Sequence, residues 1–71
     1  MRTFKIVSFN SSHKHKYKFT AKSILSAKRI SRSWMQSWMQ SCSYELRVYR
    51  NDGTTEIIAF CPSRHKPWVN Y

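Results

Sequence analysis

Three histidines and two cysteines are the side chains best suited to bind a metal ion or to act as nucleophiles: His13, His15, Cys42, Cys61 and His65. Imidazole nitrogen and thiolate sulfur are the usual zinc ligands, but their spacing here matches no C-x-x-C…H-x-x-x-H pattern. No sequence feature sets a cysteine and a histidine beside a third, orienting group, as nucleophilic catalysis requires. We expect no metal and no cofactor, and two cysteines buried as thiols, with a disulfide between them as the alternative.

The remaining catalytic signals are equally weak. The single glycine, Gly53, excludes a glycine-rich phosphate loop. The three acidic residues, Glu45, Asp52 and Glu56, lie around one turn and offer no separated pair of carboxylates for acid–base catalysis. The sequence therefore predicts a protein that is not an enzyme.

The charge of the chain is strongly one-sided. Thirteen Lys and Arg residues oppose three acids and give a net charge of +10 over 71 residues. Residues 1–44 contain no acidic residue at all. Such a field attracts polyanions, of which nucleic acid is the commonest, and an acidic protein surface or an anionic membrane are the alternatives.

Basic and aromatic residues alternate in the stretch HKHKYKFTAK at residues 13–22. Surfaces that bind single-stranded nucleic acid combine these types, because cations follow the phosphates and rings stack on bases. On a strand, Lys16 and Lys18 project to one face while Tyr17 and Phe19 project to the other, where we expect the rings to enter the core. The stretch also leads into a helix whose first turn has no acid and can face an anion.

We expect nucleic acid to be bound mainly through phosphates, with little reading of bases, because no helix-turn-helix or RRM-type motif is present. The cations expected to make the contacts, and the two rings expected to stack, are Lys5, Lys14, Lys16, Lys18, Lys22, Arg29, Arg47, Phe9 and Tyr49.

Five elements must position these residues. Alternation predicts strands over residues 3–9, 15–19, 44–50 and 55–61, and the absence of Gly and Pro predicts a helix over 21–41 that Thr20 caps. The order ββαββ predicts an α+β domain at residues 1–61: a four-stranded, mainly antiparallel sheet with one amphipathic helix across one face. Residues 62–71, with two prolines, are expected to form an irregular tail.

The helix contains the repeat SWMQSWMQSC at residues 33–42. Residues four apart share a helix face, so Trp34 and Trp38 are expected to form the core between helix and sheet. Met35 and Met39 fall at the edge of this stripe, where methionine either completes the core or forms an adaptable rim for a partner.

A protein partner is the alternative to nucleic acid. It would dock on the sheet face away from the helix, expected to show Lys5, Val7, Phe9, Lys16, Lys18, Arg47, Tyr49, Ile57 and Ala59. The residues for such a contact are Val7 and Ile57, with Met35 and Met39 as the rim, and the partner is an acidic protein or a second copy that forms a homodimer. The tail, through Trp68 or Tyr71, is the other candidate to cover the apolar strip of this face.

The location is expected to be the cytoplasm. The chain has no apolar run near the ~20 residues of a membrane span and no secretory leader pattern. Two cysteines without an export signal indicate a reducing compartment.

Overall fold

The structure is a computed structural model that describes residues 1–9, 14–36, 42–63 and 65–71. Its elements follow the chain in the order β1 (Arg2–Phe9), β2 (Lys14–Ala21), α1 (Ile24–Gln36), β3 (Ser43–Tyr49), β4 (Thr55–Cys61) and β5 (Val69–Asn70). The expected ββαββ order and α+β class are confirmed. The expected helix range was too long at its N-terminal end, and residues 37–41 lie outside the described part.

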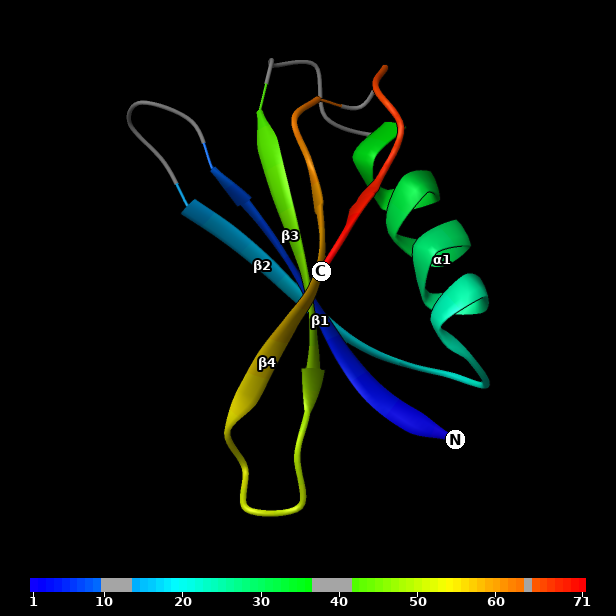
Figure 1. Ribbon diagram of the computed structural model, residues 1–71, viewed down its shortest axis with the longest axis vertical. Helices are drawn as coiled ribbons and strands as arrows, with labels where there is room; N and C mark the ends of the chain where they lie inside the picture. The colour runs from blue at the N-terminus through cyan, green and yellow to red at the C-terminus, as the bar shows by residue number, and fades with distance from the viewer. Residues whose placement is uncertain (10–13, 37–41, 64) are drawn as a thin grey trace.

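The strands form one antiparallel sheet in the order β2-β1-β3-β4-β5, and α1 lies along one face of it (Figure 1). The two hairpins meet where β1 pairs with β3, so the first strand of each hairpin is central. Residues 62–71 are not wholly irregular as expected, because Val69 pairs with Phe60 and Asn70 with Ala59. The tail thus adds a short edge strand next to α1.

The core lies between α1 and the sheet face that it covers. Alternate residues of β1, β3 and β2 point into it, and Phe4, Ile6, Tyr44 and Leu46 are fully buried. Phe19 stacks on Phe4 with ring centroids 5.9 Å apart. Of the two β2 rings expected to enter the core, Phe19 does so, whereas Tyr17 stacks on Trp34 and remains 43% exposed.

The helix begins one turn later than the sequence predicted. Thr20 belongs to β2, and the residue that caps α1 is Ser23, whose Oγ accepts a hydrogen bond from the Ser26 N–H at 3.1 Å. Serine oxygens satisfy the first free amides of a helix in this way.

The buried stripe of α1 differs from the expected one. Its buried residues are Ala27, Ser31 and Met35, which lie four apart, whereas Ile24 is 41% exposed. Trp34 is half-buried and packs against the core from the side, with its ring parallel to that of Tyr17. Trp38, the second tryptophan expected in the core, lies outside the described residues. The centre of the stripe therefore runs through Met35 rather than Trp34.

A backbone hydrogen bond closes the turn between β3 and β4. The Arg50 N–H donates to the Thr54 carbonyl at 2.8 Å, and Gly53 adopts a φ of 87°, which side chains disfavour. Further along this hairpin the register shifts by one residue, because Leu46 pairs with Ala59 and Arg47 with Ile57. Ile58 is the additional residue of a β-bulge.

Candidate nucleic-acid interface

Three cations form a row across the uncovered face of the sheet. Lys5 of β1 lies directly opposite Lys18 of β2 on one side and opposite Arg47 of β3 on the other. Adjacent strands are about 4.8 Å apart, so the row spans about 10 Å at the level of the backbone. Because successive residues alternate between faces, these side chains lie on the side away from α1.

The three cations of the row have different partners. Arg47 forms a salt bridge with Glu45 at 2.9 Å and donates to Thr55 Oγ1 at 3.2 Å, so its charge is largely balanced. The Nζ atoms of Lys5 and Lys18 lie 5.9 and 4.8 Å from the centroid of the Tyr49 ring. Cation–π contacts of this kind position the ammonium groups but leave their net charge in place.

Two further sequence-predicted residues extend the same face. Lys16 is exposed and lies opposite Val7, and Phe9 is half-buried at the end of β1. Lys14 pairs with Phe9 at the backbone level, while its side chain lies outside the described part. The structure therefore brings together four predicted cations, Lys5, Lys16, Lys18 and Arg47, with the rings of Phe9 and Tyr49. We call these six residues the basic sheet face.

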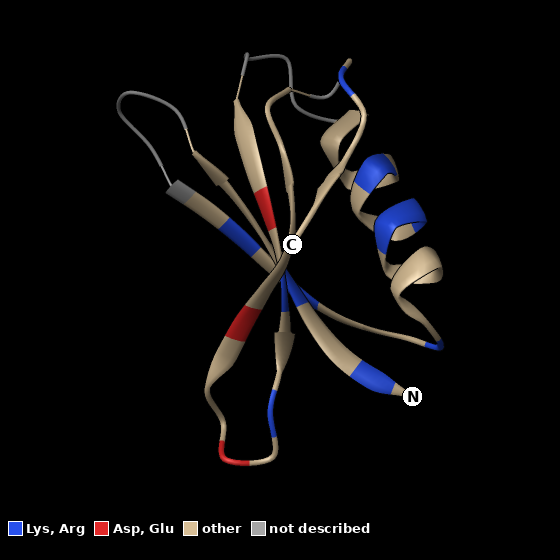
Figure 2. Ribbon diagram, viewed as in Figure 1, with Lys and Arg blue, Asp and Glu red and all other residues tan. Residues whose placement is uncertain are grey.

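The acidic residues are confined to the second hairpin, where Glu45 lies on the uncovered face beside Arg47. Figure 2 shows them in β3, β4 and the turn that joins these strands, while Lys and Arg occupy β1, β2 and α1 as well. In the described part of the chain, the salt bridges are Arg47–Glu45 and Arg50–Glu56.

The Asp52 carboxylate accepts hydrogen bonds from the Thr54 Oγ1 and N–H, which hold the pKa of Asp52 below its usual range.

Two of the predicted cations lie elsewhere. Lys22 is exposed in the segment between β2 and α1, and Arg29 is exposed on α1. Both therefore lie outside the three strands that carry the row of cations. The sequence analysis placed both residues in one interface with the sheet cations, and their positions do not support this.

The partner surface of the alternative hypothesis is only partly present. Val7 is 3% exposed and Met35 is fully buried, so neither is accessible to a partner as expected. Ile57 is half-buried on the uncovered face of the sheet, opposite Arg47, and Met39 lies outside the described residues. Ala59, expected on this face, points into the core because the bulge at Ile58 reverses the alternation.

The bulge has the opposite effect on Phe60, which sequence reasoning missed. Phe60 pairs with Glu45 and thus lies on the uncovered face, where it is half-buried. A one-residue insertion in a strand leaves little trace in the sequence, since it requires no special residue at Ile58. The sequence analysis offered Trp68 or Tyr71 as a cover for this face. The tail does not cover it, because Trp68 packs against the core and Tyr71 is 75% exposed.

The cysteines are buried thiols in the structure. Cys42 is 7% exposed, and Cys61 is fully buried with its Sγ donating to the Ser63 carbonyl at 2.8 Å. Among the described residues, no three His, Cys, Asp or Glu side chains are close enough together to hold a metal ion.

Comparisons with known proteins assign no family to the chain. No protein-family model, curated protein or solved structure matches the chain. In the described ranges, α1 is too short to cross a membrane. Any functional proposal must therefore be built on the surface chemistry of the chain.

Proposed function

We propose that this protein binds nucleic acid through phosphate contacts made by the basic sheet face. The proposal rests mainly on Lys5 and Lys18, which lie opposite each other on neighbouring strands. The salt bridges in the described part of the chain involve Arg47 and Arg50, and neither lysine takes part in them. Lys16, two residues along β2 from Lys18, adds a third cation on the same face, about 7 Å away at the level of the backbone.

The energetics of the sheet support a ligand for these charges. Like charges directly opposite each other on neighbouring strands destabilise a sheet. The protein as a whole adds to this repulsion, since its net charge is +10. A phosphate that bridges two ammonium groups would remove this repulsion and release bound counterions.

The rings of the face have a secondary part in the proposal. The Tyr49 ring already has the Lys5 and Lys18 ammonium groups over it, so a base that stacks there must displace them. Phe9, at the far end of β1, is half-buried and offers a smaller stacking surface. Binding should therefore depend on charge more than on sequence, as is common for proteins that bind single strands with low specificity.

The test is a salt titration of binding to a labelled oligothymidine and to a duplex of random sequence, followed by fluorescence anisotropy. If about five phosphates are contacted, log Kd should change with log salt concentration with a slope of about 4 in magnitude. Binding that does not weaken as salt rises, or no binding at low salt, would refute the proposal.

A pair of matched variants locates the interface. Lys18→Gln removes one charge from the basic sheet face, and we expect the salt slope to fall by about 0.7–0.9. Arg29→Gln removes the same charge from the exposed surface of α1 and should leave the slope unchanged. Equal losses in the two variants would show that net charge, rather than this face, is responsible for binding.

A further inference from the structure

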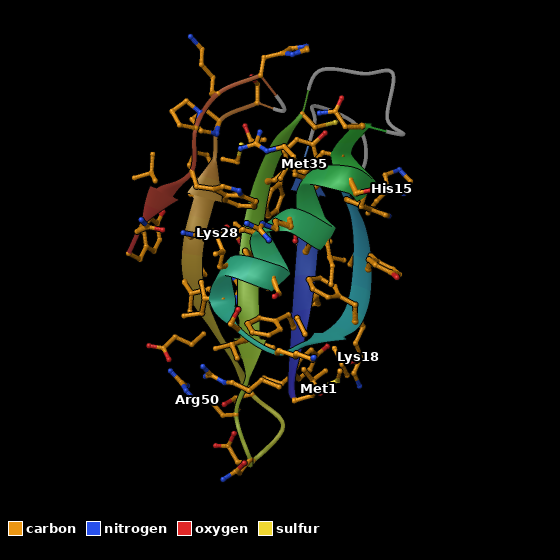
Figure 3. All side chains as sticks on the ribbon, turned by 90° about the vertical axis from the view of Figure 1, so that its right-hand side faces the viewer. Met1, His15, Lys18, Lys28, Met35 and Arg50 are labelled. Atoms are coloured by element: carbon orange, nitrogen blue, oxygen red, sulfur yellow. The ribbon has the colours of Figure 1, made fainter. Side chains whose placement is uncertain are left out.

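A shallow groove lies between α1 and the C-terminal segment, away from the basic sheet face. It has a volume of about 330 Å³ and is lined by Leu25, Lys28, Arg29, Arg32 and Trp68. Figure 3 shows Lys28 on the side of α1 that faces the C-terminal strand. The groove exists because β5 brings the tail back along the helix.

The floor of the groove is apolar although it lies at the surface. Leu25 is 61% exposed, which is high for a leucine on a helix that also covers a core. Trp68 is half-buried and packs against the core with one part of its side chain. An indole and an isobutyl group side by side can accept one large apolar side chain of a partner.

The rim of the groove is positive. Lys28 donates a hydrogen bond to the Asn70 side-chain oxygen, and Arg32 donates to the Lys66 carbonyl at 3.1 Å. The Arg32 guanidinium also lies over the Trp68 ring, 5.6 Å from its centroid. The Asn70 and Lys66 oxygens are uncharged, so these two hydrogen bonds fix the cations in position without bringing a negative charge beside them.

None of the three acidic side chains of the chain is available to bind the cations of the groove. Glu45 and Glu56 form salt bridges with Arg47 and Arg50 in the second hairpin, and Asp52 accepts from Thr54 in its turn. A second copy would bring the same engaged carboxylates and a further charge of +10. Charge complementarity therefore favours a partner that is not this chain.

From these observations we propose that the groove binds an acidic peptide segment of another protein, with one large apolar side chain on Leu25 and Trp68 and flanking carboxylates on Lys28, Arg29 and Arg32. The contact is independent of the proposed nucleic-acid binding, because it uses a different surface. The two cations fixed by hydrogen bonds provide orientation, and the exposed Arg29 adds attraction at longer range.

The experiment compares two capped peptides of equal charge, Glu-Glu-Leu-Phe-Glu-Glu and Glu-Glu-Ser-Ser-Glu-Glu, added to the full chain labelled with nitrogen-15. The first should give saturable shifts at the Trp68 indole N–H and at the backbone amides of Leu25 and Arg29. The second should bind at least about tenfold more weakly, since it lacks the apolar side chains.

Variants separate this contact from general attraction between opposite charges. Leu25→Asn leaves the charge unchanged and should weaken binding of the Leu-Phe peptide about tenfold. Lys18→Gln, on the other face, should leave this binding unchanged while it weakens oligothymidine binding.

Three outcomes would overturn the proposal. They are equal affinity for the two peptides, peptide-induced shifts centred on Lys5 and Lys18, and shifts of the groove residues caused by oligothymidine instead. The last result would assign the groove to nucleic acid.

Discussion

Lys5 and Lys18 lie directly opposite each other on β1 and β2, and both ammonium groups lie over the ring of Tyr49, at 5.9 and 4.8 Å from its centroid. One aromatic ring thus holds two like charges on one face of the sheet. The attraction of each ammonium for the ring opposes their mutual repulsion, and both contributions are of the order of 0.5–1 kcal/mol at an exposed site.

A double-mutant cycle of Lys5→Gln and Lys18→Gln should reveal the repulsion. We expect each single variant to change the free energy of unfolding by about 0.5 kcal/mol or less, because lost repulsion offsets the lost contact with Tyr49. The coupling between the two should be unfavourable in low salt and should fade near 1 M salt, where charges are screened beyond about 3 Å. Urea unfolding at the two salt concentrations measures this. A favourable coupling in low salt would show that the two lysines stabilise each other through the ring.

Asp52 should respond to acid in a defined direction. Thr54 donates two hydrogen bonds to its carboxylate, which lowers the pKa of Asp52 below the value in the unfolded chain. A carboxyl whose pKa is lowered by folding stabilises the fold above its unfolded pKa, and this contribution is lost as pH falls through the folded pKa.

The variant Thr54→Val tests this directly, because it removes the larger of the two hydrogen bonds and keeps the side-chain shape. We expect the pKa of Asp52, followed by the carbon-13 shift of its carboxyl group, to rise toward its ordinary value. An unchanged Asp52 titration would mean that Thr54 does not hold the carboxylate in solution.

The sequence predicts the sheet well but not which residues of β4 lie on each face. Alternation from β1 through β3 assigns Lys5, Lys18 and Arg47 to the uncovered face, as observed. The same alternation fails in β4, because the bulge at Ile58 moves Ala59 to the core and Phe60 to the uncovered face. A strand pattern contains no information on an extra residue unless glycine or proline marks it.

The helix shows a different limit of sequence reasoning. A wheel weighted by size places the large side chain of Trp34 at the centre, but the tight space above the sheet is filled by Ala27 and Ser31 instead. Small residues let a helix approach a sheet closely, and the bulky indole then fits at the side. The sequence analysis also missed the groove between α1 and Trp68, because nothing in residues 62–71 predicts that β5 returns beside α1.

Ser31 is the polar side chain in this close contact. It is fully buried, and its Oγ has no hydrogen-bond partner within the described part of the structure. Ser31→Ala should therefore stabilise the protein by about 0.5–1.5 kcal/mol, through better helix propensity and the loss of an unsatisfied hydroxyl. Ser33→Ala, on the exposed side of α1, gives the propensity effect alone and should gain less. A loss of stability in Ser31→Ala, measured by urea unfolding, would mean that the hydroxyl does find an acceptor.

The orientation of α1 predicts opposite fates for two large apolar residues on it. Met35 is fully buried, so Met35→Ala should cost about 2–5 kcal/mol, a large part of the stability of so small a domain. Leu25 is 61% exposed, and Leu25→Ala should change stability by no more than about 0.5 kcal/mol. Met35→Leu conserves volume and should keep the loss below about 1.5 kcal/mol, which leaves a folded variant even if Met35→Ala unfolds. Thermal and urea unfolding of the three variants measures these differences. Similar losses for Met35→Ala and Leu25→Ala would contradict this orientation of α1, and Leu25 would then not be free to hold a partner.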